Sequence, residues 1–349
     1  MASEPLLQVR GLKVRFATED GTVRAVDGVD FELERGQVLG IVGESGSGKS
    51  VTAQTIIGLT RANNARIEGS VKLEGEDLLS ASDSDLRRLR GDRIGMIFQD
   101  PMTSFNPVYR IGDQIVEAIR AHRETSKSEG KRRVVELFEA VGIPNAERRV
   151  DDYPHEFSGG MRQRAMIAMA LALEPEVLIA DEPTTALDVT IQAQILGLLE
   201  QLNRERNLAT ILITHDLGVV AEVADRVLVM YAGKVVEEGT LDEIFYDPQH
   251  PYTWGLLGSL TRIDRPRPHR LPQIAGSPPS LLDLPDGCPF RPRCPHEFSK
   301  CPQYPGLEAR LPEAADHRDR CWLTPEEKKA KRLVEGQIGL EPPPEVRQA

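Results

Sequence analysis

The order of apolar and polar positions predicts several short strands. Residues 12–16 and 29–33 alternate apolar with polar side chains, which indicates half-buried antiparallel strands. Other short runs are almost wholly apolar, as expected of strands that are buried on both faces. These apolar runs are residues 38–42, 94–98, 177–182 and 209–214. Residues 227–230 and 234–237 predict a hairpin.

Apolar residues at helical spacing mark two other parts of the chain. Residues 111–143 carry them on both sides of a polar break at 126–133, and we expect a separate helical layer there. Residues 189–206 predict one more helix. Together with the buried strands, these helices indicate an α/β fold.

One glycine-rich stretch joins a buried strand to a helix in this pattern. It fits the phosphate-loop pattern G-x-x-x-x-G-K-[ST], with Gly43, Glu44, Ser45, Gly46, Ser47, Gly48, Lys49 and Ser50. Glycines let backbone N–H groups curl around a phosphate, and the N-terminus of the next helix favours anions. Lys49 can reach the β- and γ-phosphates of a nucleotide, and the Ser50 hydroxyl can bind Mg²⁺. The alternative is an ordinary turn that ends in Lys-Ser.

Polar side chains end or directly follow three of the apolar runs. Asp181 can support Mg²⁺, and Glu182 can act as a general base toward water. Gln99 can contact Mg²⁺ or the attacking water, or it can be a turn residue. A lone histidine is more often structural, but the place of His215 at a third strand end favours the same site.

Two further features have open interpretations. Ser158 can cap a helix, and Gly159 and Gly160 leave the first N–H groups of that helix free for a phosphate. An ordinary capped helix is the alternative. Phe16 can stack on an adenine or belong to the core, and composition alone favours the core.

Charge and composition restrict the partners. The chain has 349 residues and a formal net charge of −11, whereas broad nucleic-acid binding requires a basic face. The first residues lack the apolar segment of a signal peptide, and the longest apolar run is too short to span a bilayer. We therefore expect a cytoplasmic protein that can lie against a membrane protein.

All four cysteines lie near the end of the chain, at Cys288, Cys294, Cys301 and Cys321. Their C-x5-C-x6-C-x19-C spacing fits neither the usual zinc ribbon nor the ferredoxin run. Four thiols in one segment of a cytosolic protein favour a metal over free thiols, with zinc slightly ahead of an iron–sulfur cluster on chemistry alone.

These motifs, in this order, resemble the nucleotide-binding subunits of ABC transporters. The matching residues are the phosphate loop, Gln99, Ser158-Gly159-Gly160, Asp181-Glu182, Asp188 and His215. The signature departs from the family's Leu-Ser-Gly-Gly-Gln, since Phe157 precedes and Met161 follows an intact Ser-Gly-Gly. The strings at residues 41–51, 98–104, 181–190 and 250–253 resemble the dipeptide/oligopeptide (peptide/nickel) importer branch, and the cysteines resemble its D-type subunit.

The resemblance implies a domain plan. An ABC ATPase domain, residues 1–261, would contain a mixed parallel core sheet, an antiparallel β subdomain and a helical subdomain at about residues 103–172. A proline-rich linker follows at 262–286 and a small cysteine-rich extension at 287–325. We expect the charged tail at 326–349 to be disordered. The D-type resemblance also implies a [4Fe-4S] cluster at the four cysteines, with zinc as the alternative.

The resemblance also implies a mechanism. Two such subunits form a head-to-tail dimer, with each ATP held by the phosphate loop and Val51 of one and by Ser158-Gly159-Gly160 of the other. Further implied roles are adenine stacking for Phe16, Mg²⁺ binding for Ser50, Gln99 and Asp181, water activation for Glu182, γ-phosphate contact for His215 and a link between the two sites for Asp188.

The function implied is ATP hydrolysis that powers import of dipeptides or oligopeptides. Partners would be a homologous F-type ATPase, two membrane permeases and a solute-binding protein, at the cytoplasmic face of the inner membrane, with no nucleic acid. Nickel, glutathione or another small solute is the alternative cargo. A soluble ABC ATPase acting on DNA or ribosomes is disfavoured by the single motif set and the acidic charge. A regulator without hydrolysis is disfavoured by Glu182 and His215.

Overall fold

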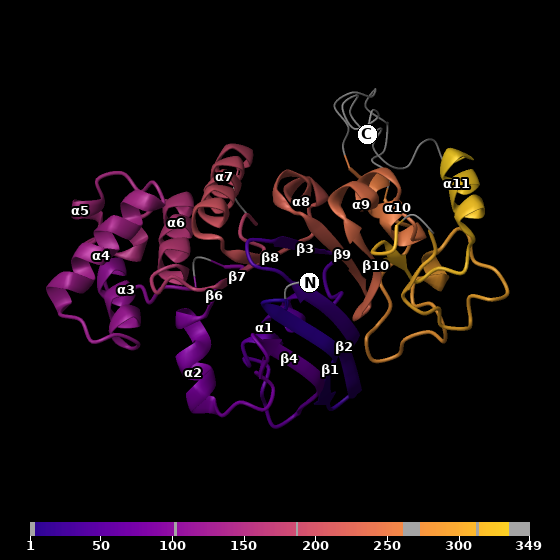
Figure 1. Ribbon diagram of the computed structural model, residues 1–349, viewed down its shortest axis with the longest axis horizontal. Coiled ribbons are helices and arrows are strands. Elements are labelled where there is room, and N and C mark those ends of the chain that lie inside the picture. The colour runs from indigo at the N-terminus through magenta and orange to yellow at the C-terminus, as the bar shows by residue number, and fades with distance from the viewer. Residues whose placement is uncertain (1–3, 101–102, 186–187, 261–272, 312–313, 335–349) are drawn as a thin grey trace.

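Two β-sheets and a lateral group of helices make up the structure, a computed structural model shown in Figure 1. It describes residues 4–100, 103–185, 188–260, 273–311 and 314–334. Within these ranges one sheet has four strands in the order β2-β1-β4-β5. The other has eight strands, in the order β11-β12-β10-β9-β3-β8-β7-β6.

The smaller sheet is antiparallel, as the alternating pattern predicted. Its strands are β1 (Leu7–Thr18), β2 (Gly21–Leu33), β4 (Ala65–Leu73) and β5 (Glu76–Asp77). The alternating pattern predicted a strand at 12–16, but β1 begins at Leu7 and continues through Gly11. The pairing of β1 with β2 shifts register between Val9 and Leu12, where Gly11 has a φ of 55°. A bulge at glycine thus bends one long strand instead of ending it.

The larger sheet contains the parallel core. Its parallel strands are β3 (Val38–Val42), β6 (Ile94–Ile97), β7 (Val177–Asp181), β8 (Ala209–Thr214) and β9 (Arg226–Tyr231). Strand β10 (Lys234–Thr240) runs antiparallel to β9 and forms the predicted hairpin. Because β3, β6, β7 and β8 are parallel, their carboxyl ends lie at one edge of the sheet.

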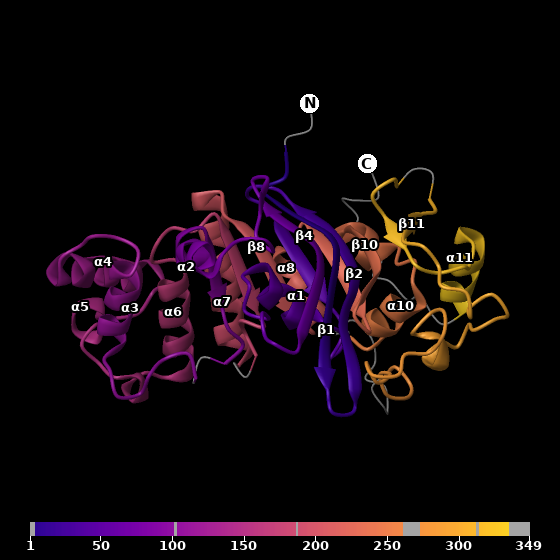
Figure 2. The same cartoon turned by 90° about the horizontal axis from the view of Figure 1, so that it is seen from below.

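Helices lie beside the core strands and form one end of the molecule. The helices near the core strands are α1 (Lys49–Ile56), α2 (Asp83–Asp92), α7 (Val189–Arg206), α8 (Leu217–Val223), α9 (Leu241–Tyr246) and α10 (Pro251–Gly258). The lateral group is α3 (Ile111–Arg120), α4 (Lys127–Ala140), α5 (Ala146–Arg149), the 3₁₀ turn Pro154–Glu156 and α6 (Gly159–Ala170). Figure 2 also shows this group at one end. No helix in the described ranges combines the length and apolarity needed to cross a bilayer.

The polar break expected at residues 126–133 is mostly helix. Ser126 caps α4, its hydroxyl accepting from the Glu129 N–H, and the Glu129 carboxylate accepts from the Ser126 N–H in return. This capping box starts α4 at Lys127, and its polar first turns face solvent. The gap between α3 and α4 is therefore shorter than the hydropathy pattern indicated.

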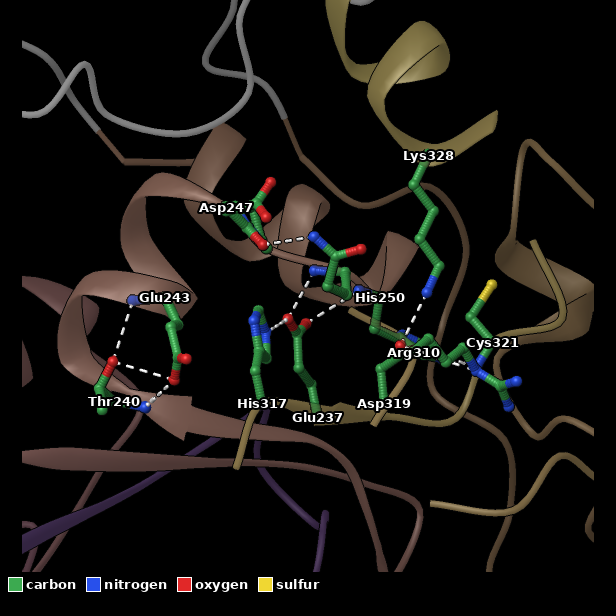
Figure 3. A network of polar contacts seen from close by, with 12 residues as sticks. Glu237, Thr240, Glu243, Asp247, His250, Arg310, His317, Asp319, Cys321 and Lys328 are labelled. Atoms are coloured by element: carbon green, nitrogen blue, oxygen red, sulfur yellow. Dashed lines mark hydrogen bonds and ion pairs between the residues drawn. The ribbon is translucent and has the colours of Figure 1, made fainter. Parts of the chain in front are cut away.

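The C-terminal segment continues the core sheet. Strands β11 (Glu308–Ala309) and β12 (Arg318–Asp319) are added at its edge, where β12 pairs with β10. The expected disorder from residue 326 is wrong for 326–334, because α11 (Pro325–Val334) forms there. Its Lys328 ammonium lies 2.7 Å from the Asp319 carboxylate with neither side chain exposed by more than 2% (Figure 3). Residues 262–272 of the expected linker and 335–349 of the expected tail lie outside the described residues.

Candidate nucleotide-binding site

The phosphate loop lies between β3, which is wholly buried, and α1. Gly43, Gly46 and Gly48 have φ values of 151°, 76° and 101°, in the region that favours glycine. At Gly48 a Cβ atom would also lie 2.4 Å from the carbonyl oxygen of Ala25. The loop therefore takes a backbone path that other residues cannot follow, at the N-terminus of a helix.

Lys49 begins α1 and folds back over the loop. Its ammonium donates to the carbonyl oxygens of Gly43 at 2.7 Å and of Glu44 at 3.0 Å, and only 5% of the residue is exposed. Burial lowers the pKa of Lys49, against the opposing charges of Glu182, Asp181 and Glu44. A cation that is held by carbonyl dipoles and partly desolvated is suited to bind phosphate oxygens.

Ser50, in the first turn of α1, contacts Asp181 at the end of β7. The Ser50 hydroxyl donates to the Asp181 carboxylate at 2.9 Å, and Asp181 is 3% exposed at the end of β7. Burial raises the pKa of Asp181, and the Ser50 hydrogen bond only partly offsets this. A hydroxyl and a carboxylate are oxygen donors of the type that Mg²⁺ prefers. The pair fits the expected ion.

Glu182 is the residue on which three other side chains converge. Its carboxylate accepts from Gln99 Nε2 at 3.0 Å and from Thr185 Oγ1 at 2.8 Å, and His215 Nδ1 lies 3.3 Å away. Its φ of 50° is unusual for a residue with a side chain, and its N–H donates to the Ile213 carbonyl. Burial opposes ionisation, but the contacts with Thr185 and His215 outweigh it and lower the pKa of Glu182.

The sequence-predicted residues at the strand ends thus meet at one place. Gln99 follows β6, Glu182 follows β7 and His215 follows β8, and the three strands are neighbours or next neighbours in the parallel sheet. Sequence reasoning missed Thr185, although it lies in the same loop. The geometry brings a carboxylate, an amide and an imidazole together beside the phosphate loop; the role of each remains a prediction.

Two predicted features are exposed residues at the starts of other helices. Ser158 caps α6, its hydroxyl accepting from the Met161 N–H at 3.3 Å, and Ser158 and Gly159 are exposed. Asp188 caps α7, is exposed, and precedes Val189, which is 82% exposed. Figures 1 and 2 both show α6 apart from α1. Ser158, Gly159 and Asp188 are therefore presented on the surface.

Phe16 lies on β1, opposite Val23 of β2 and Ala65 of β4. The ring is partly buried and packs against the apolar core of the smaller sheet. Adenine stacking by Phe16 remains a prediction.

Two contacts to Glu44 were absent from the sequence interpretation. The Glu44 N–H donates to the Tyr252 hydroxyl of α10 at 2.8 Å, and the Glu44 carboxylate pairs with Arg293. Tyr252 belongs to the string His-Pro-Tyr-Thr, which was noticed only as a family feature. Arg293 carried no signal, because it lies far along the chain among the cysteines.

The four cysteines are partly exposed and line one small cavity. Burial raises the thiol pKa of Cys288 to about 11 and those of Cys294 and Cys321 to about 12. Among the described residues, no group of three or more His, Cys, Asp or Glu side chains has the arrangement of a metal site. Four thiols are donors of the type that a thiolate-bound metal requires, but their arrangement in the structure is not that of a preassembled metal site.

Known proteins resemble the chain along nearly its whole length. A family model described as "ABC transporter" matches residues 26–185, and one described as "Oligopeptide/dipeptide transporter, C-terminal region" matches residues 236–301. The dipeptide transport ATP-binding protein DppD of Bacillus subtilis is 52% identical over 322 residues, covering 92% of this chain and 95% of that protein. The oligopeptide transport ATP-binding protein OppD of Salmonella typhimurium is 54% identical, covering 88% and 91%.

Solved structures agree with this likeness. The dimeric ATP-binding cassette MJ0796, described as a post-hydrolysis state bound to ADP and Pi, has a TM-score of 0.61 and 28% identity and covers 67% of this chain and 98% of its own. The phosphate loop and the residues at the strand ends belong to the shared cassette. The chain therefore belongs to the ABC transporter family, as one of its ATP-binding ATPase subunits.

Proposed function

We propose that this chain is the ATP-hydrolysing subunit of an importer for dipeptides or oligopeptides. The observation that carries the proposal is the match of residues 236–301 to the oligopeptide/dipeptide C-terminal region, outside most of the common cassette. Relatives more than half identical to the chain are named as dipeptide or oligopeptide transport proteins. These names supply the cargo class, and the cassette supplies the ATPase chemistry.

The proposed hydrolysis uses the groups at the strand ends. The Glu182 carboxylate accepts a proton from the water that attacks the γ-phosphorus of ATP, while the bond from that phosphorus to the bridging oxygen breaks and ADP leaves. Its contacts with Gln99 and His215 hold it in place, and His215 reaches the γ-phosphate. Lys49 and the loop N–H groups stabilise the charge that develops on the phosphate oxygens. Ser50 and Gln99 would hold Mg²⁺ with support from Asp181, and the ion would neutralise phosphate charge.

A head-to-tail dimer is part of the proposal. Ser158, Gly159 and Gly160 complete the ATP site of a second subunit, and Asp188 links the two sites. Support comes from the exposure of Ser158, Gly159 and Asp188 and from the separation of α6 and α1 in Figure 1. The second subunit would be a homologous F-type ATPase. Phe16 would stack on the adenine of the chain's own ATP.

The remaining partners follow from the importer class. Two membrane permeases and a solute-binding protein would complete the complex, with this chain at the cytoplasmic face of the membrane. We divide the chain into a cassette at 1–261, a linker at 262–286 and a C-terminal extension at 287–325. The name "C-terminal extension" is kept below for residues 287–325.

A metal at the four cysteines is a second part of the proposal. Cys288, Cys294, Cys301 and Cys321 would hold a [4Fe-4S] cluster, with zinc as the alternative, and the group would stabilise the C-terminal extension. Support comes from the shared cavity that all four thiols line. The raised pKa values of Cys288, Cys294 and Cys321 mean that a bound cation is needed to keep these thiolates ionised at neutral pH.

ATPase measurement on the complex tests the importer. The tagged chain is purified from its native membrane with its partners, and ATP turnover is measured with the peptide-loaded binding protein. Stimulation by peptides that is lost in Lys49→Ala supports the proposal. Stimulation by nickel or glutathione alone would overturn the peptide cargo, and co-purification with ribosomes or DNA would overturn import.

Metal analysis tests the cysteine site. The chain is purified without oxygen, and iron, sulfide and zinc are measured per chain, with Cys294→Ser beside it. Iron and sulfide in equal amounts that fall in the variant support the cluster. Zinc in place of iron overturns the cluster but keeps the site, and metal-free wild-type protein overturns both.

A further inference from the structure

We propose that Arg293 of the C-terminal extension is a positioning residue for the phosphate loop. It neutralises the Glu44 carboxylate and so keeps the loop fit to bind a polyphosphate. The inference rests on the proposed nucleotide site and adds to it a residue outside the ATPase cassette.

The contact is a two-pronged ion pair between distant parts of the chain. Arg293 Nη1 lies 2.5 Å from Glu44 Oε2, and Nη2 lies 3.0 Å from Glu44 Oε1. The Arg293 side chain is 5% exposed and that of Glu44 is 28% exposed. Pairs of this geometry combine two charge-assisted hydrogen bonds with a fixed orientation. Glu44 is the second residue of the phosphate loop, so the pair acts directly on that loop.

Other contacts fix the guanidinium in this position. Arg293 Nε donates to the Ala275 carbonyl at 2.9 Å, Nη2 donates to the Ile274 carbonyl at 3.2 Å, and Nη1 lies 3.3 Å from the Tyr231 hydroxyl. Arg293 ends the 3₁₀ turn Arg291–Arg293. The guanidinium is therefore held before any ligand arrives, and little side-chain entropy remains to be lost.

Phe290, the residue before this turn, packs on the cassette. That ring is 2% exposed and packs edge-on to Tyr231, with its centroid 5.3 Å from the Tyr231 ring and 5.3 Å from the Tyr252 ring. The Tyr252 hydroxyl accepts from the Glu44 N–H. Glu44 is thus held at its backbone by Tyr252 and at its carboxylate by Arg293.

Charge explains why this pairing matters for nucleotide binding. Lys49 donates to the Glu44 carbonyl, and the Glu44 carboxylate contributes to the electrostatic surroundings of Lys49. A carboxylate near the Lys49 ammonium repels the phosphates of a nucleotide unless another cation neutralises that carboxylate. Arg293 is the cation in contact with that carboxylate among the described residues. Removing it leaves a partly buried negative charge beside the site.

This reasoning predicts that the cost of losing Arg293 depends on the charge of Glu44. Dissociation constants for MgADP and for MgATP with a non-hydrolysable γ-phosphate are measured by calorimetry on the full chain. Arg293→Gln should weaken binding by about tenfold, because Glu44 is then unpaired. The double variant Glu44→Gln/Arg293→Gln should recover most of that loss, since the unpaired charge is gone. Arg293→Lys, which keeps the charge without the fork, should fall between.

Arg291→Gln is the matched control. Arg291 lies in the same turn, pairs with Glu297 at 3.3 Å and donates to the Asp286 carbonyl. Its loss should leave the dissociation constants within about twofold of wild type. Thermal unfolding of each variant is recorded alongside, so that loosening of the C-terminal extension is measured separately.

The outcomes separate the inference from the site itself. Wild-type affinity in Arg293→Gln overturns the inference alone. Weak binding in Arg293→Gln that Glu44→Gln does not relieve also overturns it, because a merely structural anchor would give that result. A wild-type chain that binds no nucleotide overturns the proposed site and this inference together.

Discussion

Glu237 and His317 form an ion pair with no exposed surface on either side chain. His317 Nε2 lies 2.8 Å from Glu237 Oε1, and the side-chain exposure is 0% for both. Glu237 lies on β10, and His317 directly precedes β12 in the C-terminal extension (Figure 3). The same carboxylate accepts from the N–H groups of Gln249 and His250 before α10. One buried carboxylate therefore joins the cassette sheet, α10 and the C-terminal extension.

Removal of His317 should destabilise the protein strongly. In His317→Ala the buried Glu237 carboxylate keeps two backbone donors but loses its cation, which we expect to lower the free energy of unfolding by about 3 kcal/mol. Urea unfolding measures this change in the free energy of unfolding. Arg204→Gln, which breaks a pair between side chains that are 74% and 39% exposed, should change that free energy by less than about 0.5 kcal/mol. Equal effects of the two variants would show that burial does not strengthen the pair.

The stabilisation from His317 should also depend on pH. Burial opposes protonation, but Glu237 outweighs it and raises the pKa of His317 above 6.5. The folded state then holds the proton more tightly than the unfolded state does, so this stabilisation is present below about pH 6.5 and is lost as pH rises through the raised value. The pKa of Glu237 is lowered from 4.5 despite its burial, so Glu237 stays ionised in this range.

A comparison of wild type with His317→Gln tests the pH dependence. The difference in free energy of unfolding should be larger at about pH 6 than at about pH 8.5. His155→Gln serves as the control, because His155 is an exposed histidine. A difference that is constant with pH, or larger at high pH, would mean that His317 is neutral in the folded protein.

Glu182→Gln should stop turnover and keep nucleotide binding. Glutamine can still accept from Thr185, so the loop geometry is retained, but it cannot take a proton from water. We expect ATP turnover by the complex to fall by about 10²- to 10⁴-fold, with the affinity for MgATP within a few-fold of wild type. The steady-state rate and the dissociation constant are measured on the same preparation.

The control for this variant is Glu205→Gln. Glu205 is an exposed carboxylate on α7 that accepts from Gln201 one turn earlier. The complex that carries Glu205→Gln should turn over ATP at the wild-type rate. Unchanged turnover in Glu182→Gln would remove Glu182 from the role of base and leave water activation to another group.

Local patterns in the sequence predicted the centre of the molecule well. The phosphate loop, the apolar strands around it and the helix Val189–Arg206 follow from short-range signals, namely motif spacing, apolar runs and helical periodicity. Parallel strands then bring Gln99, Glu182 and His215 to one edge. The roles of these residues await the experiments above.

Much of the C-terminal part depends on contacts between residues far apart in the chain. Strand β12 has two residues and exists because β10 offers an edge to pair with. Helix α11 begins with a capping box between Thr324 and Glu327, a local signal that the sequence interpretation missed, and Lys328 also finds a buried partner in Asp319. The pairing of Arg293 with Glu44 joins residues 249 positions apart. Long-range partners of this kind decide structure where composition alone indicates a linker or a tail.

Asp181→Asn should give a protein that is more stable and no longer binds nucleotide in a Mg²⁺-dependent way. Burial raises the folded-state pKa of Asp181 above 3.8, so its contribution to stability is greatest below that pH and is lost as pH rises through the raised value. Asparagine is neutral and can still accept from Ser50. The melting temperature of Asp181→Asn should exceed that of wild type at about pH 7.5, and the gain should shrink as pH falls through the raised pKa toward about 3.8. Asp83→Asn, whose side chain is 82% exposed, should show no such gain. A less stable Asp181→Asn at neutral pH would mean that the ionised carboxylate stabilises the fold. Metal binding would then not be the reason that an acid is buried at position 181.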